Sequence, residues 1–304
     1  MTKGSSFQYE CPLSLEELRG AISRLPLDRT GFLAGGTDLL IAVTSGKHPV
    51  ERIIDLKRIP GMKGIEQREE GIWIGSLTSI HALERNEIIL SHAKALAEGA
   101  ETLGSWQIRN RATIGGNLGN ASPTADTAPP LLALDAQVLT WGLEGERTIP
   151  IGSFWVSAGK SSLNKGEIIT GVLIPLHKES SSAYMKLGPR EAMDITVASA
   201  AAVVRVKEGN IDYIRLALGG AAPTPIRARS AENYLLGKPA DSENLLQAGL
   251  LAAEDSNPRD SMRASRDYRL RVIPGLVQKA VEHALRKNKT FLDHDLLKGQ
   301  GGEA

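Results

Sequence analysis

Two glycine-rich segments hold the residues best suited to chemistry. The first reads Leu33-Ala34-Gly35-Gly36-Thr37-Asp38-Leu39-Leu40, and the second begins Thr113-Ile114-Gly115-Gly116-Asn117 and runs on to Asp126. Glycine has no Cβ and tolerates positive φ, so consecutive backbone N–H groups can converge on one anion. Thr37, Thr113 and Ser122 add hydroxyl donors. Two such segments together predict a cradle that grips a diphosphate from two sides.

The glycine spacing excludes the two commonest nucleotide loops. Neither segment contains GxGxxG, nor GxxxxGK followed by Ser or Thr, so a Rossmann site or a P-loop is not supported. A Gly-Gly pair after a strand is also typical of an ordinary turn, so a reading without any ligand stays open.

The elements that must position these segments change character along the chain. In the first half we expect a helix from the capping box at 14–17 to about residue 25, short strands at 31–33, 52–56 and 72–74, and helices at 38–44, 79–85 and 91–103. Residues 104–124 are expected to form a long loop, followed by an apolar helix from Pro129, a hairpin at 136–150 and a strand at 167–174. After a polar junction at 177–182, strands at 184–187, 194–206 and 210–219 predict an antiparallel meander, with helices at 228–236, 242–253 and 264–285.

Composition limits the classes of function. The 304 residues suggest about two domains. With 36 basic and 35 acidic side chains, no nucleic-acid partner is expected. The longest apolar stretch, 195–204, is far short of the ~20 residues that span a bilayer, so we expect no membrane insertion and a cytoplasmic protein. The single cysteine, Cys11, cannot by itself hold zinc or an iron–sulfur cluster, so any metal redox centre must lie on another chain.

The order of several motifs resembles one protein family over nearly the whole chain. These motifs are AGGTDLL at 34–40, GSWQIRNR at 104–111, TIGGNLGNASPTAD at 113–126, REAMDI at 190–195 and SRDYR at 265–269. Together they are similar to the FAD-binding (medium) subunits of the molybdenum hydroxylases, the xanthine dehydrogenase and CO dehydrogenase medium-subunit family.

The resemblance implies an α+β fold in two parts. The first is a PCMH/vanillyl-alcohol-oxidase-type FAD-binding domain over residues 1–176, with subdomains of about 1–57 and 58–176. The second is a C-terminal domain like that of the CO dehydrogenase flavoprotein, over 180–289, with a three-stranded antiparallel sheet plus helices. Residues 290–304 are expected to form a tail with a mobile end.

The resemblance also implies roles for particular residues. Leu33 to Leu40 should wrap the FAD diphosphate and ribityl chain, and Thr113 to Asn117 should form the opposite wall. Leu103, and Ile168 or Ile169, match apolar contacts, while Asp126 matches a contact to the adenosine portion and Lys186 a cation near the flavin. For the apolar residues ordinary core packing stays open. For Asp126 an exposed helix-capping role stays open, and for Lys186 a surface position.

By the same resemblance the chain is an electron-transfer oxidoreductase subunit of a heterotrimer. A large partner would carry molybdopterin, a small partner [2Fe-2S] clusters, and FAD here would pass electrons to an acceptor such as NAD+. FAD should be non-covalent because no histidine lies in either glycine loop; the nearest is His48. No side chain of this chain needs to act as acid, base or metal ligand, because the cofactor carries the chemistry.

Two departures divide the family further. With Cys11 alone, the chain cannot carry the extra cluster of the 4-hydroxybenzoyl-CoA reductase branch, and Thr37-Asp38 replaces the His-Ser usual in CO dehydrogenases. These points favour a purine, N-heterocycle or aldehyde substrate. Trp106 stands where many relatives have proline. Two alternatives stay open: a stand-alone flavin reductase of the UDP-N-acetylenolpyruvoylglucosamine reductase type, and a non-catalytic nucleotide-binding assembly module.

Overall fold

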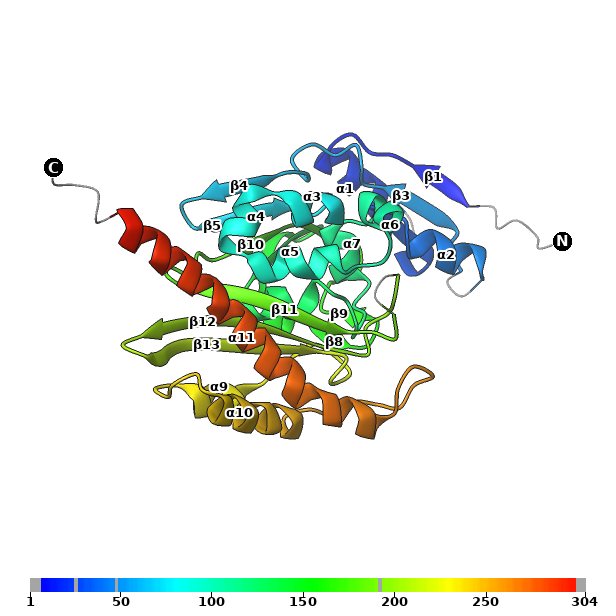
Figure 1. Cartoon of the computed structure of the whole chain (residues 1–304). Helices are drawn as coiled ribbons and strands as arrows, with labels where there is room; N and C mark the ends of the chain where they lie inside the picture. The colour runs from blue at the N-terminus through cyan, green and yellow to red at the C-terminus, as the bar shows by residue number, and fades with distance from the viewer. Residues whose placement is uncertain (1–6, 25–26, 47–48, 191–192, 299–304) are drawn as a thin grey trace.

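The computed structural model describes residues 7–24, 27–46, 49–190 and 193–298 and contains three main sheets with helices packed between and beside them (Figure 1). The helices are α1 (Leu15–Ser23), α2 (Leu39–Thr44), α3 (Ile80–Arg85), α4 (Glu87–His92), α5 (Lys94–Glu101), α6 (Trp106–Arg111), α7 (Ile114–Gly119), α8 (Ala128–Ala133), α9 (Arg229–Leu235), α10 (Ser242–Glu254) and α11 (Arg266–Lys298), with short 3-10 turns at Leu27–Arg29 and Ile151–Ser153.

The first sheet is small and parallel. It consists of β1 (Gln8–Glu10), β2 (Thr30–Leu33) and β3 (Arg52–Asp55) in the order β1-β3-β2. The predicted capping box starts α1, since Ser14 Oγ accepts a hydrogen bond from Glu17 N at 3.1 Å. The Glu17 carboxylate reaches back one residue further than expected and accepts from Leu13 N at 2.8 Å.

The second sheet is antiparallel and has five strands. These are β4 (Ile65–Arg68), β5 (Gly71–Gly75), β10 (Ile168–Ile174), β6 (Gln137–Gly142) and β7 (Gly145–Pro150), in that order across the sheet. β6 and β7 form the expected hairpin, and a further small hairpin joins β8 (Trp155–Ser157) to β9 (Lys160–Ser161). The largest apolar core forms where this sheet meets α3, α5, α7 and α8.

Three short helices in this half differ from the sequence prediction. The segment 104–124 is not one long loop, because it contains α6 and α7. Ser105 and Thr113 cap these helices by accepting hydrogen bonds from Ile108 N and Gly116 N. The helix expected from residue 91 begins at Lys94, and a separate helix, α4, precedes it with Asn86 as its cap.

The third sheet explains the long apolar run. Its strands are β11 (Ser181–Leu187), β12 (Ala198–Lys207), β13 (Asn210–Gly219) and the two-residue β14 (Ile226–Arg227), so a short fourth strand joins the predicted three. Alternate residues of β12 are buried on opposite faces: Ala201 and Val203 pack toward α5 and α8, whereas Ala200 and Ala202 pack in the core with α10 and α11. A strand buried on both faces reads as a continuous apolar run. β12 begins at residue 198 rather than 194, and two of the preceding residues, Asp194 and Thr196, make other contacts described below.

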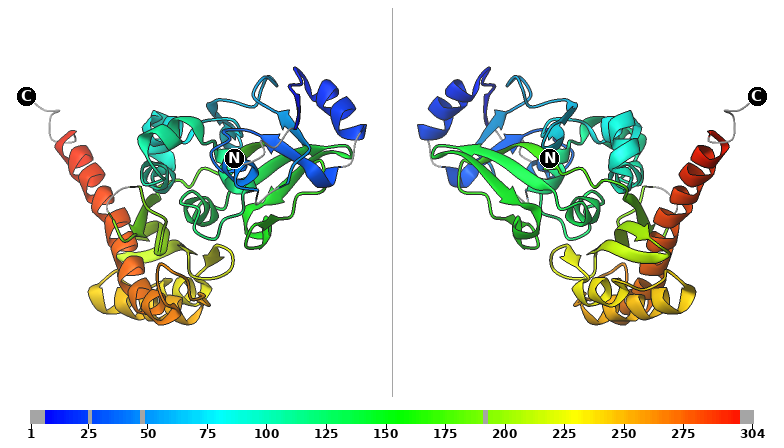
Figure 2. Two further views of the ribbon diagram at one scale, coloured as in Figure 1. Left: turned by 90° about the vertical axis from the view of Figure 1, so that its right-hand side faces the viewer. Right: turned by 90° about the vertical axis from the view of Figure 1, so that its left-hand side faces the viewer.

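The last helix is longer than expected. α11 continues past residue 285 to Lys298, so the prediction that the helix ends there is wrong; residues 299–304 lie outside the described part. α11 runs along one outer edge of the molecule, on the side away from the N-terminal sheet (Figure 2). Within the described ranges, no helix has the length and apolar character needed to cross a membrane.

Candidate functional site

The first glycine loop connects β2 to α2. Leu33 is buried in a small core with Val43 and Ile53, and Leu39 packs against the same core, so both ends of the loop are anchored. Gly36 has φ +82°, a left-handed conformation that favours glycine. Leu40 is exposed.

The backbone donors of this loop are free. In the part of the chain that the structure describes, the N–H groups of Gly35, Gly36, Thr37 and Asp38 have no protein acceptor. None of these four residues is buried, so water or a ligand can reach them. Because a left-handed glycine followed by further N–H groups forms a concave anion site, the loop retains the donors that a diphosphate needs.

The two glycine loops touch. A Cβ placed on Gly35 would lie 2.1 Å from Arg111 O, and the end of α6 therefore packs directly on the first loop. A Cβ on Gly116 would lie 3.7 Å from the Cβ of Ala34. The structure therefore brings together the two segments that the sequence singled out.

The second loop differs from the prediction in its donors. Ile114 N donates to Thr78 O at 3.1 Å, Gly115 N to Ser76 O at 2.9 Å, and Asn117 N to Thr113 O at 2.9 Å. Gly116 N donates to the capping hydroxyl of Thr113 at 3.1 Å. These N–H groups are occupied, so the expectation that both loops present free backbone donors is wrong for the second one. Its placement as a wall opposite the first loop stays a prediction.

The apolar candidates separate into two environments. Ile169 lies beside the second loop, because a Cβ on Gly119 would be 3.8 Å from Ile169 Cδ1. Ile168 points to the opposite side of β10 and packs in the core with α1. Leu103 is partly buried against the large core. Of the two isoleucines, Ile169 is the one near the loops.

Asp126 and Lys186 form a buried ion pair between the two halves of the chain. Lys186 Nζ lies 2.9 Å from Asp126 Oδ2, and the side chains are only 9% and 7% exposed. Asp126 also accepts hydrogen bonds from Tyr184 Oη at 2.9 Å and from the hydroxyl of Thr196. Asp126 is therefore not an exposed helix cap and Lys186 is not a surface lysine.

The environment of the pair changes its proton affinity. Burial raises the pKa of the Asp126 carboxyl, and Lys186 with the two hydroxyl donors opposes that rise. Burial also raises the pKa of Tyr184 well above its usual value, and the Asp126 charge adds to the effect. Tyr184 is therefore a neutral donor.

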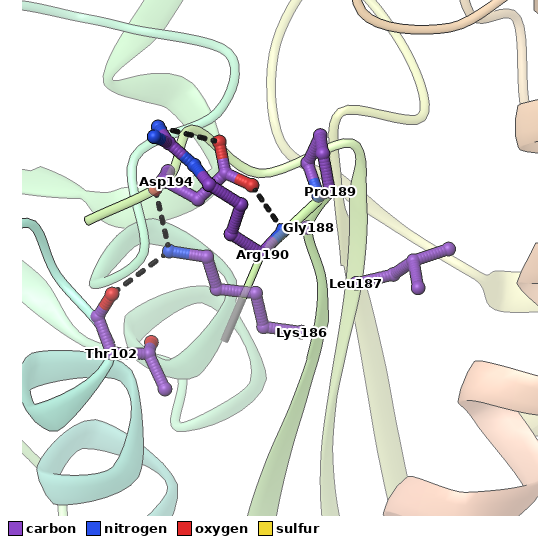
Figure 3. A pocket seen from close by; sticks show the side chains of 7 residues that line it. All are labelled: Thr102, Lys186, Leu187, Gly188, Pro189, Arg190 and Asp194. Carbon is purple, nitrogen blue, oxygen red and sulfur yellow. Dashed lines mark hydrogen bonds and ion pairs between the residues drawn. The ribbon is translucent and has the colours of Figure 1, made fainter. Parts of the chain in front are cut away.

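Lys186 also borders a cavity (Figure 3). Its ammonium donates to Thr102 O at 2.9 Å and Asp194 O at 3.1 Å, so with Asp126 all three of its protons are used. The cavity measures about 370 Å³ and is also lined by Arg190, whose backbone N–H donates to Asp194 Oδ2 at 2.8 Å. No residue of either glycine loop lines it.

Two residues of this network were missed in the sequence. Tyr184 precedes Lys186 by two positions in β11 and therefore lies on the same face of the strand. That alternation could have identified Tyr184 as a neighbour of Lys186. Thr196 lies in the irregular segment before β12, and no pattern in the sequence marks it.

The residues present fit a flavin dinucleotide in two respects. The first loop offers free backbone donors and a close approach that only glycine allows. Asp38 is the one acidic side chain of the loop; desolvation raises the pKa of the Asp38 carboxyl, and a hydrogen bond from Thr37 opposes that rise.

Comparisons with known proteins cover both halves of the chain. A family model described as the FAD binding domain in molybdopterin dehydrogenase matches residues 5–177. A second, described as the CO dehydrogenase flavoprotein C-terminal domain, matches residues 183–284.

Individual relatives extend over similar ranges. The xanthine dehydrogenase FAD-binding subunit of Escherichia coli is 36% identical over 257 residues, which cover 84% of this chain and 88% of the relative. The carbon monoxide dehydrogenase medium chain of Hydrogenophaga pseudoflava is 30% identical over 279 residues, or 91% and 96% of the two chains. The solved carbon monoxide dehydrogenase from the same organism superimposes with a TM-score of 0.89 over 94% of this chain and 99% of the other.

Proposed function

Because this chain belongs to the family of FAD-binding medium subunits of molybdenum hydroxylases, we propose that it is the flavin-carrying, electron-transfer subunit of such an enzyme. It is an oxidoreductase subunit whose cofactor is FAD. When bound, FAD supplies redox chemistry that can exchange electrons singly or in pairs. The proposal has the chain receive electrons from [2Fe-2S] clusters of a small partner and pass them to an acceptor such as NAD+.

Partner subunits are part of this proposal. Relatives are named as the medium chain of carbon monoxide dehydrogenase and as the alpha subunit of a 6-hydroxypseudooxynicotine dehydrogenase complex. These names support a large molybdopterin-bearing partner and a small iron–sulfur partner here. The cytoplasmic location and the purine, N-heterocycle or aldehyde substrate stay predictions.

The observation that carries the site is the set of free N–H groups at Gly35–Asp38. We propose that these groups bind the diphosphate, and that Thr113–Asn117 closes the opposite side as a packed wall. We propose that Leu103 and Ile169 contact the cofactor. The residue boundaries expected for the domains, with a junction near 177–182, remain part of this proposal.

Asp126 and Lys186 have a combined role in the proposal. Asp126 accepts three hydrogen bonds, one of them from Lys186, and its negative charge offsets the positive charge of Lys186. We therefore propose that the two residues influence bound FAD together, as an ion pair. Lys186→Met should change the flavin midpoint potential, measured by dye-linked titration. An unchanged potential would show that Lys186 does not tune the flavin.

The experiment that tests the function is the visible spectrum of the purified full chain after incubation with FAD and desalting. A yellow complex that releases one FAD per chain in acid supports the proposal. The same spectrum is recorded on the complex co-expressed with its neighbouring reading frames, in which cluster-bearing and molybdenum-bearing chains should co-purify. If the pure, FAD-containing chain turned over a substrate without partners, the stand-alone reductase would replace this proposal. A colourless chain and a colourless complex would favour the reading of the loops as simple turns.

A further inference from the structure

A largely buried ion pair joins α6 to α3, and neither of its residues is among the proposed cofactor contacts. Arg109 of α6 places Nε 2.6 Å from Glu84 Oε2 of α3, and the two side chains are 16% and 7% exposed. The N–H of Arg109 does not point at the carboxylate oxygen, so the contact is an ion pair without an aligned hydrogen bond. The attraction between Arg109 and Glu84 therefore depends on their opposite charges more than on hydrogen-bond geometry.

Glu84 is the centre of a small charged cluster. His81 Nδ1 lies 2.6 Å and Arg85 Nε 3.5 Å from its other carboxylate oxygen, Oε1. The ring of His81 packs edge-on against Trp106, the first residue of α6. The cluster therefore holds the first residue and the middle of α6 against α3.

Arg109 also reaches the turn before its own helix. Its Nη1 donates to Leu103 O at 3.4 Å. Leu103 is one of the apolar residues proposed to contact the cofactor. One guanidinium thus ties α6 to α3 and to the turn after α5.

The end of α6 is the surface on which the first glycine loop rests. Arg111 O is the atom that a Cβ on Gly35 would meet at 2.1 Å. The next residue, Ala112, accepts a hydrogen bond from Ile80 N at the start of α3 at 2.9 Å. A shift of α6 relative to α3 would therefore move the Arg111 carbonyl group, on which Gly35 packs, and with it the first loop and its free N–H groups.

From this geometry we propose that Arg109 and Glu84 are positioning residues for the FAD cradle. They do not touch the cofactor; they fix the α6 carbonyl beneath Gly35 and the carbonyl of Leu103. This inference rests on the proposed function, because it assumes that the first loop binds FAD.

The test compares this pair with a matched pair elsewhere. Arg227 and Glu232 form an ion pair of similar burial in the C-terminal half, with side chains 10% and 7% exposed. Arg109→Met and Arg227→Met are made in the full chain and, in parallel, in the co-expressed complex. FAD affinity, visible circular dichroism of the bound flavin and thermal stability are measured for each.

We expect Arg109→Met to weaken FAD binding roughly tenfold. An effect of about this size is seen at metal sites when a residue that orients a ligand is removed. The flavin circular dichroism of Arg109→Met should also change, whereas Arg227→Met should lose stability with unchanged FAD affinity and flavin spectrum. Arg109→Lys keeps the charge and should restore affinity to within about threefold. Glu84→Gln is the variant of nearly equal volume that tests the same pair if Arg109→Met does not fold.

The outcomes separate this inference from the function on which it rests. If the parent chain and complex bind no FAD, the proposed function fails first. If the parent binds FAD, and Arg109→Met and Glu84→Gln bind it as the parent does, the positioning role is overturned. Equal loss of FAD affinity in Arg109→Met and Arg227→Met would also overturn it, because a general loss of stability would then explain both.

Discussion

Replacing Gly35 by alanine tests the cradle at its tightest point. The new Cβ would lie 2.1 Å from Arg111 O, 2.9 Å from Arg111 C and 3.0 Å from Ala112 Cα, all of them backbone atoms. Gly35 is not in the left-handed region of φ that favours glycine, so the effect expected for an alanine is the steric one. Backbone atoms cannot move away by a rotamer change as a flexible side chain can, so the clash must displace the chain itself.

The size of the effect follows from the distance. Ordinary contact begins at 3.4 Å, so the first loop and the end of α6 must separate by about 1.3 Å. Forcing an extra methyl group into packed structure costs about 1–3 kcal/mol. If that displacement falls on the FAD-bound geometry, affinity falls roughly 5- to 150-fold, since each 1.4 kcal/mol is tenfold.

The assay is FAD binding to the full chain, followed by flavin fluorescence, with Gly249→Ala as the matched control. A Cβ on Gly249 would meet Pro274 Cα and O at 2.7 Å, a similar backbone clash between α10 and α11. Gly249→Ala should lower the melting temperature and leave FAD affinity unchanged. If Gly35→Ala bound FAD within about twofold of the parent, or if both variants lost affinity equally, the steric argument would be refuted.

Three further predictions concern stability and titration. Lys186→Met should lower the free energy of unfolding by about 3 kcal/mol, because it leaves the buried Asp126 carboxylate without its cation; chemical denaturation checks this, and Asp126→Asn added to it should recover part of the loss. The hydrogen bond from the Tyr9 hydroxyl to the Asp55 carboxylate raises the pKa of Tyr9 to about 12. The stabilising effect of this hydrogen bond is therefore complete below pH 10.0, the usual pKa of tyrosine, and is lost as the pH rises toward 12. An ultraviolet tyrosinate titration of the parent minus Tyr9→Phe should show that late step, and a step near 10 would contradict it. Gly20→Ala should stabilise the chain by up to about 1 kcal/mol in thermal unfolding, because nothing lies within 4 Å of the new methyl group in the helix α1.

The long periodic elements could be predicted from the sequence, whereas the short helices around the site could not. Strands such as β13, expected at 210–219 and found at Asn210–Gly219, have an alternating pattern that does not depend on distant partners. α7 has three glycines in six residues and little intrinsic tendency to form a helix. It is held by hydrogen bonds from Ile114 N and Gly115 N to Thr78 O and Ser76 O, which only the tertiary structure supplies.

The candidate site divides in the same way. The glycine loops could be found because glycine pairs are local signals, but the pairing of Asp126 with Lys186 joins residues 60 positions apart. No local pattern distinguishes a buried lysine that has a partner from an exposed one. The fold supplies that difference by packing β11 against α5, and both side chains are more than nine-tenths buried.

The two Gly-Gly pairs are alike in sequence and differ in physical role. In the first loop, glycine permits a close approach at Gly35 and a left-handed turn at Gly36, and the donors of the loop stay free. In the second, Gly115 lets α7 pack on Ser76, where a Cβ would come within 2.6 Å of the serine Cβ, and its N–H is used in that packing. One pair therefore keeps free N–H groups for the anion that we propose it binds, whereas the N–H groups of the other pair are used in packing, so two similar glycine motifs do not offer the same backbone donors to a ligand.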